Sequence, residues 1–180
     1  GGTPMGKGSV AGLVFSDGRI KITDGKGLPK SPQLTPAAPD LNGLSSSMVI
    51  PEGHDVLITT ASGKMLRLDT TKIRPQGVAG NGVAGIALAE GDSIVGAATL
   101  GPDQVILTCS EGAYKVTAAK EIPVKGRGTG GVMVHKLTGK DSGVNHVYVG
   151  DGVSVNGSPA EPTPRSKATV KKAVVDFEEI

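Results

Sequence analysis

The chain has 180 residues, of which 37% are hydrophobic and 20% are charged, and its net charge is +2. This composition belongs to a globular chain and excludes wholesale disorder. The small positive charge permits a polyanionic partner without requiring one, because binding depends on where the cations sit. With 28 glycines and only 2% aromatic residues, the chain favours many short strands around a core of Val, Ile, Leu and Ala.

The single cysteine, the lack of long apolar runs and the N-terminus indicate the cellular compartment of the protein. Cys109 is the only cysteine, which excludes an intrachain disulfide and is consistent with a reducing environment. No apolar run approaches the ~20 residues that a membrane span requires. We therefore expect a cytoplasmic protein with no membrane partner. Residues 1–9 read as a linker without a signal peptide, and the absence of Met at residue 1 indicates a piece of a longer protein.

The first predicted element is a β-hairpin over residues 10–22, with its turn at Asp17-Gly18. Alternation along the return strand places Arg19 and Lys21 on the face opposite the two isoleucines. Residues 25–44 follow with four prolines, which cannot donate ladder hydrogen bonds, so an extended loop is predicted there.

A stretch of the chain then occurs twice, with a constant separation of 49 positions between equivalent residues. Gly63 and Gly112 mark the same hairpin turn in the two copies, and Val83 and Val132 end the same glycine-rich loop. Strands of the first copy are predicted over residues 56–60, 64–68, 83–88 and 93–100. Four short strands in a repeat of this length indicate an all-β, propeller-like array.

The end of the chain departs from this repeat. Residues 151–157 are expected to form a turn or a partial strand, which closes a domain over residues 10–157. Residues 158–180 are predicted as a linker and C-terminal tail, whose last part is either a weak helix or a docked strand.

No catalytic constellation is present in the sequence. The three histidines, His54, His135 and His146, lack cysteine or carboxylate partners at metal-ligand spacing. Nucleophile-elbow, Walker-lysine and paired-carboxylate patterns are also missing. We expect no catalytic residue, cofactor or metal in this chain.

The basic residues fall at repeated positions of the two copies, so they are expected on one rim of the array: Lys64, Arg67, Lys72, Arg74, Lys115, Lys120, Lys125 and Arg127. Such a row could follow a phosphate backbone, with neighbouring glycines offering N–H donors. Equally, the glycines could serve a tight connection and the cations could be merely solvated. The residues alone leave both interpretations open.

The ordered set of motifs resembles the repeats of the C-terminal domain of the A subunit of bacterial DNA gyrase and topoisomerase IV. The family pattern is Thr-x-x-Gly-x-x-Lys-Arg, followed by Tyr-Arg-x-Gln-x-Arg-Gly-Gly-Lys-Gly-Val. The first copy matches it with Thr60-Ala-Ser-Gly63 and Ile73-Arg74-Pro-Gln76, and the second with Lys115 and Lys125-Gly126-Arg127-Gly128. The resemblance covers about residues 10 to 150.

The resemblance implies a β-pinwheel, in which four-stranded blades exchange strands and the outer rim binds and bends duplex DNA. This chain would hold about three blades. It also implies two protein partners, the A-subunit dimer and a topoisomerase B subunit. Mg²⁺ and ATP would be needed only by the parent enzyme, ATP through the B subunit, and the catalytic tyrosine would lie in a preceding region.

The sequence departs from the family in the box Gln-Arg-Arg-Gly-Gly-Lys-Gly with which gyrase wraps DNA. In the first copy Gly77 and Val78 replace the two arginines and Asn81 replaces the lysine, while the second copy keeps Arg127. Each lost cation removes a potential phosphate contact. The departure favours a topoisomerase IV-like domain that guides DNA for relaxation and decatenation without wrapping it.

The predicted DNA contacts are the cations of the hairpins and loops together with one glutamine: Arg19, Lys21, Lys64, Arg67, Lys72, Arg74, Gln76, Lys115, Lys120, Lys125 and Arg127. The alternative function is a propeller-like protein-interaction module that makes no direct contact with DNA.

Overall fold

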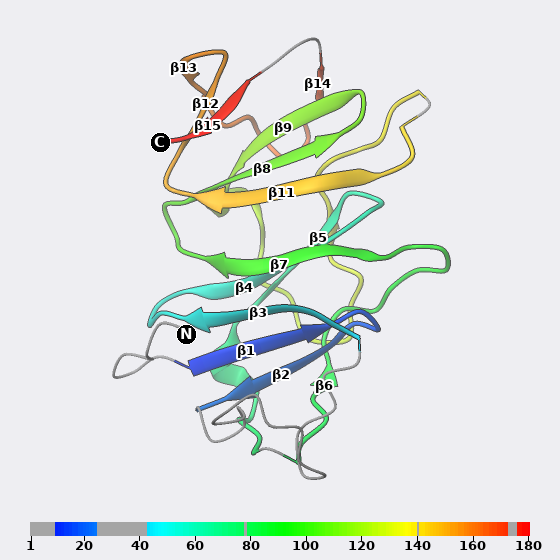
Figure 1. Ribbon diagram of the computed structural model, residues 1–180, viewed down its shortest axis with the longest axis vertical. Coiled ribbons are helices and arrows are strands. Elements are labelled where there is room, and N and C mark those ends of the chain that lie inside the picture. The colour runs from blue at the N-terminus through cyan, green and yellow to red at the C-terminus, as the bar shows by residue number, and fades with distance from the viewer. Residues whose placement is uncertain (1–9, 25–42, 78, 140, 173–175) are drawn as a thin grey trace.

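The computed structural model describes residues 10–24, 43–77, 79–139, 141–172 and 176–180. The linker predicted over residues 1–9 and most of the predicted proline-rich loop lie outside these ranges. The described chain is all-β, with three four-stranded sheets and one three-stranded sheet (Figure 1). Its helical turns are two short 3-10 segments, η1 (Thr70–Lys72) and η2 (Ala119–Glu121).

Each sheet is built on an antiparallel hairpin, and we number the sheets as blades 1 to 4 in chain order. The hairpins are β1 (Val10–Phe15) with β2 (Arg19–Thr23), β4 (Asp55–Thr60) with β5 (Lys64–Leu68), β8 (Val105–Ser110) with β9 (Ala113–Ala118), and β12 (Val153–Val155) with β13 (Ser158–Pro159). A later strand pairs with the first strand of each hairpin: β3 (Leu44–Ile50), β7 (Ile94–Leu100), β11 (Val144–Gly150) and β15 (Phe177–Glu179).

The outermost strand of each complete blade comes from the next repeat along the chain. β6 (Val83–Ala84) pairs with β2 of blade 1, β10 (Val132–Met133) with β5 of blade 2, and β14 (Val170–Lys171) with β9 of blade 3. This exchange of strands ties neighbouring repeats together. It is the β-pinwheel arrangement that the family resemblance implies.

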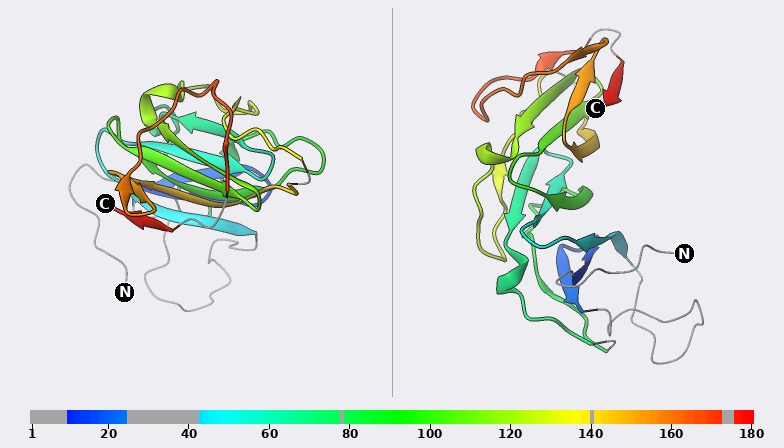
Figure 2. Two further views of the ribbon diagram at one scale, coloured as in Figure 1. Left: turned by 90° about the horizontal axis from the view of Figure 1, so that it is seen from above. Right: turned by 90° about the vertical axis from the view of Figure 1, so that its left-hand side faces the viewer.

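The blades follow one another along an open arc. β3, β7 and β11 lie side by side in that order on one side of it (Figure 1). Seen from the side, the arc bows away from these strands, and the glycine-rich loop that precedes β10 runs along its convex side (Figure 2). The predicted three blades are therefore present, and the three-stranded blade 4 continues the same arc.

The core lies between blades, where apolar faces of neighbouring sheets meet. Val14 and Ile20 of blade 1 share a cluster with Ile58 and Leu66 of blade 2, and all four side chains are fully buried. Further clusters join blade 2 to blade 3 and blade 3 to Val153 and Phe177 of blade 4. Where blades lie on both of its faces, as for β4 and β5 of blade 2, a hairpin strand is buried on both sides, which aliphatic residues achieve without large aromatic ones.

Two predictions are corrected here. The strand predicted over residues 83–88 is limited to Val83–Ala84. It ends there because the next two amides, those of Gly85 and Ile86, both donate to the Gly18 carbonyl in the hairpin turn that precedes β2. The segment 158–180, predicted as a linker and tail, contains β13, β14 and β15 and completes blades 3 and 4. Its described end is a docked strand, which was one of the two predicted alternatives.

Candidate nucleic-acid interface

Cations from both repeats meet at a groove between η1 and the loop that enters β10. The groove has a volume of about 260 Å³ and is lined by Leu68, Asp69, Lys72, Ile73, Val124, Lys125, Gly126 and Arg127. Lys72, Lys125 and Arg127 are all exposed. The arrangement therefore gathers three cations and one carboxylate, that of Asp69, at the boundary of two repeats.

The two walls of the groove are fixed by backbone contacts. Asp69 caps η1 by accepting a hydrogen bond from the Thr71 amide (3.0 Å). Opposite it, the Lys125 amide donates to the Arg67 carbonyl (3.0 Å). The Arg127 guanidinium donates to the Ala84 carbonyl (3.0 Å) and remains exposed. Because Lys125 is held through its amide, its exposed side chain is not used in this attachment.

The corresponding loop of the first repeat carries a different chemistry. Gln76 uses its side-chain oxygen to accept a hydrogen bond from the Gly82 amide (2.8 Å), and so braces the loop from inside. The Gly80 amide donates to Gly77. These two amides are used within the protein, which favours the second of the two interpretations left open by the sequence, that the glycines serve a tight connection. Arg74, just before the loop, is exposed and is the loop's nearest predicted cation.

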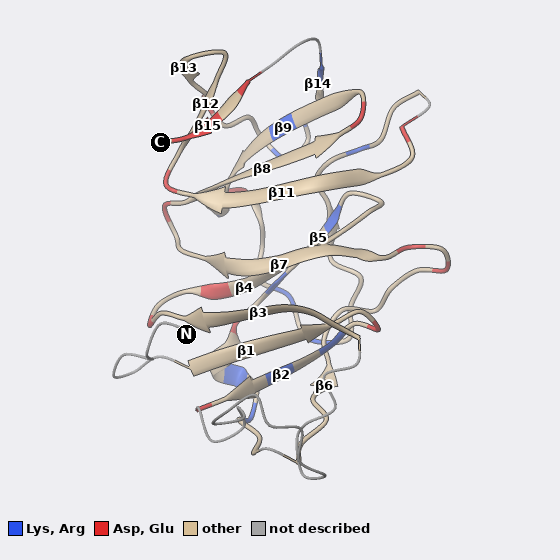
Figure 3. Ribbon diagram, in the orientation of Figure 1, with Lys and Arg blue, Asp and Glu red and all other residues tan. Residues whose placement is uncertain are grey.

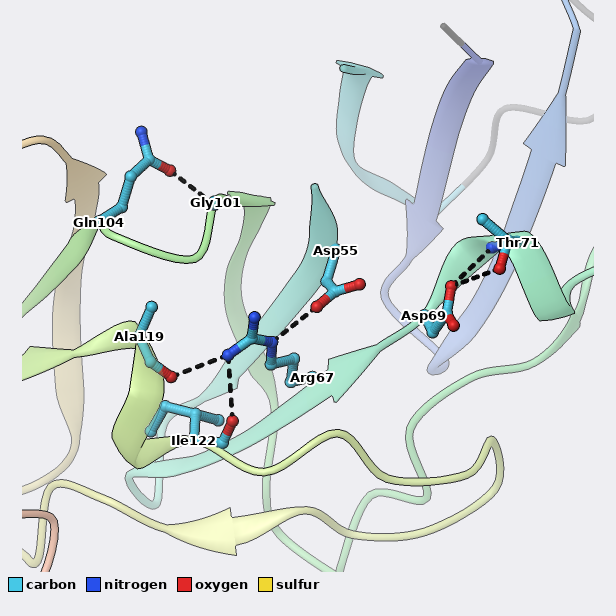
Figure 4. Close-up of polar contacts among 8 residues, drawn as sticks. All are labelled: Asp55, Arg67, Asp69, Thr71, Gly101, Gln104, Ala119 and Ile122. Carbon is cyan, nitrogen blue, oxygen red and sulfur yellow. Dashed lines mark hydrogen bonds and ion pairs between the residues drawn. The ribbon is translucent and has the colours of Figure 1, made fainter. Parts of the chain in front are cut away.

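Arg67, predicted as a phosphate contact, instead joins two blades. Its Nε lies 2.7 Å from Asp55, and its side chain is 12% exposed. Its Nη1 donates to the carbonyls of Ala119 (2.8 Å) and Ile122 (3.2 Å) in the next repeat (Figure 4). All the contacts of this guanidinium are internal, so it leaves the candidate set.

Lys21 and Lys115 also leave the candidate set, because each is only 1% exposed. Burial lowers the pKa of both amines. The Lys115 ammonium donates to three backbone carbonyls, those of Val134 (2.8 Å), Arg165 (2.6 Å) and Lys167 (2.7 Å). Strand alternation predicted an outward face for Lys21, and the repeat predicted a rim position for Lys115, but both side chains are buried.

The remaining predicted cations are spread along the arc. Arg19 pairs with Asp17 (2.7 Å) and lies 4.6 Å from the centre of the Phe15 ring. Lys64 is half-buried beside Glu90 and Asp92, whereas Lys120 is exposed on η2. Lysine and arginine thus occur on β2, β5 and β9 and between the blades (Figure 3). The structure brings only Lys72, Lys125 and Arg127 into one groove.

Two serine–aspartate pairs that the sequence analysis missed hold the hairpin turns. Asp92 accepts from the Ser62 hydroxyl (2.6 Å) and the Ser62 amide. Asp141 accepts from Ser110 (2.7 Å) and from the Gly112 amide (2.7 Å). The two aspartates are 49 positions apart, so the repeat itself carried the signal. Hydrogen bonds from Ser62 hold the pKa of Asp92 below its usual value despite partial burial.

Neither a metal cluster nor a membrane-crossing helix occurs in the described residues. Within those ranges, no group of three or more His, Cys, Asp or Glu side chains is placed to hold a metal ion. Nor does any helix in that part of the chain have the length and apolarity to cross a membrane.

The repeats match a known family. The family described as "DNA gyrase C-terminal domain, beta-propeller" matches residues 54–100 and 103–144, which are the two copies of the repeat. A relative from Mycolicibacterium smegmatis, "Topoisomerase subunit TopoM", is 42% identical over 167 residues, which cover 91% of this chain and 23% of that protein. The A subunit of Escherichia coli DNA gyrase is 39% identical over 85 residues, 47% of this chain and 10% of that protein. The chain thus spans less than a quarter of these relatives.

A solved structure shares the fold. "Crystal structure of the C-terminal domain of DNA topoisomerase IV" superposes with a TM-score of 0.70 over 85% of this chain and 50% of that chain, at 22% sequence identity. At this level of identity the likeness concerns the fold alone.

Proposed function

Because the chain belongs to the family of DNA gyrase C-terminal domains, we propose that it binds and bends duplex DNA as the C-terminal domain of a type IIA topoisomerase A subunit. The domain would guide a duplex segment during relaxation or decatenation. Its partners would be duplex DNA, the A-subunit dimer and the B subunit, in the bacterial cytoplasm. Mg²⁺ and ATP would be held elsewhere in that assembly.

The observation that carries the proposal is the groove of Lys72, Lys125 and Arg127. Phosphate contacts by lysine and arginine supply most of the sequence-independent affinity for DNA. The three cations lie within one groove at the boundary of two repeats. Exposed Arg74 and Lys120 precede the two glycine-rich loops and would extend the track along the arc.

The same residues favour bending over wrapping. Of the predicted contacts, Lys21, Arg67 and Lys115 are committed inside the protein, and Gln76 braces its own loop. Fewer phosphate contacts provide less energy to hold DNA around a full turn. A short track on a curved surface still rewards a moderate bend, whose cost depends on how deformable the DNA sequence is.

The test removes one groove cation from each repeat in the variant Lys72→Gln/Lys125→Gln. Neither substitution touches the core, so the fold is expected to remain intact. The affinity for a duplex of about 40 base pairs is measured across salt concentrations. We expect the slope of log K against log salt to become shallower by about 1.8, since each contact contributes about 0.9.

A control variant, Lys136→Gln, removes one exposed cation outside the groove and is expected to leave the slope within about 0.3 of the parent value. If the parent chain fails to bind duplex DNA even at low salt, the proposal is wrong. The protein-interaction alternative would then be favoured.

A further inference from the structure

The loops that lead into β6 and β10 share one pattern of attachment, and a third stretch has the same pattern. Each begins with a backbone amide that donates to a carbonyl of the hairpin it crosses: Gln76 to Ile22 (2.8 Å), Lys125 to Arg67 (3.0 Å) and Thr163 to Val116 (2.9 Å). The three acceptors occupy equivalent positions in the return strands of blades 1, 2 and 3.

The three stretches also end in the same way. Nine residues after the first amide, a second amide donates to the glycine of the hairpin turn: Gly85 to Gly18 (3.1 Å), Val134 to Gly63 (2.9 Å) and Lys172 to Gly112 (2.7 Å). Residues 163–172 therefore form a third copy of the loop and its exchanged strand. It lies in the segment where the sequence predicted only a linker and tail.

The third loop differs in how it is joined to its neighbour. In the second loop, the Gly128 amide donates directly to the carbonyl of Gly85 in the first loop (2.6 Å). Val134 is the equivalent of Gly85, and its carbonyl accepts instead from the buried Lys115 ammonium, which also binds the carbonyls of Arg165 and Lys167. Lys115 thus replaces the direct backbone contact and positions the third loop.

The third loop also carries more cations than the first two. Arg165, Lys167, Lys171 and Lys172 lie within ten residues, and Arg165 occupies the position of Arg127. Lys172 lies 5.9 Å from the centre of the Phe177 ring, and Arg165 is half-buried. Lys167 and Lys171 are exposed, so they are the two cations available to a ligand on the rim.

We propose that residues 163–172 form a further contact for the DNA phosphate backbone, made by Lys167 and Lys171 and positioned by Lys115. This inference rests on the proposed function, since it extends the same track by one blade. Its separate basis is the shared attachment, which places the third loop on blade 3 as the second loop is placed on blade 2. A duplex that follows the convex side past Lys125 and Arg127 would reach this loop next.

The first experiment compares Lys167→Gln/Lys171→Gln with Lys72→Gln/Lys125→Gln and with the Lys136→Gln control, using a duplex of about 40 base pairs. We expect the salt slope of the first variant to fall by about 1.8, as for the groove variant. An unchanged slope for Lys167→Gln/Lys171→Gln, with a reduced slope for the groove variant, overturns this inference and leaves the proposed function standing. Failure of the parent chain to bind duplex DNA overturns both.

The second experiment tests the positioning role with Lys115→Leu, because leucine occupies the equivalent site, Leu66, in blade 2. Hydrogen exchange is followed at the amides of residues 163–172 and 125–134. We expect loss of protection confined to residues 163–172, together with a reduced salt slope. Equal protection in the variant and the parent would show that Lys115 does not position the loop. A loss of protection throughout blade 3 would show that the lysine serves the whole blade and would equally overturn the positioning role.

Discussion

At the scale of single residues, burial decides which cations serve the fold and which remain for a ligand. Arg67 illustrates the first group, because its guanidinium satisfies a carboxylate of its own blade and two carbonyls of the next one. Each of these groups would otherwise lie at a blade boundary without its charged partner. Leaving a partly buried carboxylate or carbonyl unsatisfied costs more than an exposed ion pair contributes.

Arg67→Ala is therefore expected to lower the free energy of unfolding by about 3 kcal/mol. Chemical denaturation, followed by far-UV circular dichroism, measures the change. Arg74→Ala is the matched control, since Arg74 is exposed, and it should shift stability by no more than about 0.5 kcal/mol. If Arg67→Ala kept the parent stability but reduced the salt slope of DNA binding, Arg67 would have to be returned to the phosphate contacts.

At the scale of elements, the hairpin turns lie unusually close to the neighbouring repeat. Gly63 has a φ of 93°, a conformation that side chains disfavour. Its carbonyl accepts from the amides of Val134 and His135 (2.9 and 3.0 Å). A Cβ at this position would overlap the carbonyl oxygen of His135. The turn therefore requires glycine for two separate reasons, its backbone angle and its contact.

Gly63→Ala is expected to destabilise the chain by about 3 kcal/mol, from the left-handed conformation and the overlap together. Gly91→Ala separates the two causes, because Gly91 has a similar φ of 79° with no atom within 4 Å of the added methyl. It should cost about 1 kcal/mol. Equal values of the unfolding free energy for the two variants would mean that the hairpin turn tolerates the methyl by shifting away from His135.

Much of the fold could be predicted because each repeat contains short sequence patterns, turn residues and apolar runs, that indicate its strands. The hairpins around Gly63 and Gly112 were predicted from turn residues and apolar runs, and the 49-residue register aligned their partners. The repeat that ends in β15 was missed because it is contracted. Thr163 follows its equivalent Lys125 by 38 positions rather than 49. The hairpin strands of this last repeat, β12 and β13, have only three and two residues. Only the backbone attachments reveal the equivalence.

The candidate site was less predictable than the fold. Alternation correctly indicated that Lys21 points away from the isoleucines beside it, but it could not show that this side is buried. Lys115 and Arg67 were placed on the rim from their repeated positions, which likewise do not report burial. Whether a strand face is exposed depends on how blades stack, which is a property of contacts distant in sequence. Lys72, Lys125 and Arg127 escaped this error because they lie outside the strands.

At the scale of the whole molecule, the blades interact mainly with the blades next to them along the arc. Each blade packs on the next through an apolar cluster, and each complete blade borrows a strand from the following repeat. Stability in such arrays is approximately a sum of repeat terms and nearest-neighbour terms. Blade 3 should therefore depend on residues 153–179, whereas blade 1 should not.

Cys109 offers a direct measure of that dependence, since it is the only cysteine in the sequence and is 3% exposed in blade 3. Burial raises the pKa of its thiol, which further slows reaction with thiol reagents. It belongs to the cluster that contains Val153 and is packed by Ala160 and Phe177. Removing these residues opens one side of the cluster to solvent and takes β14 away from β9.

A chain ending at Gly150 is expected to react with a thiol reagent about tenfold faster, or more, than the full chain, because blade 3 opens more often. The control Ile180→Ser changes an exposed residue at 65% relative exposure and should leave the rate unaltered. Hydrogen exchange at β1 and β4 should remain protected in the shortened chain, which distinguishes local opening of blade 3 from general unfolding. Equal thiol reactivity in the shortened and full chains would mean that blades 1 to 3 form a self-sufficient unit, with the last repeat merely attached to it.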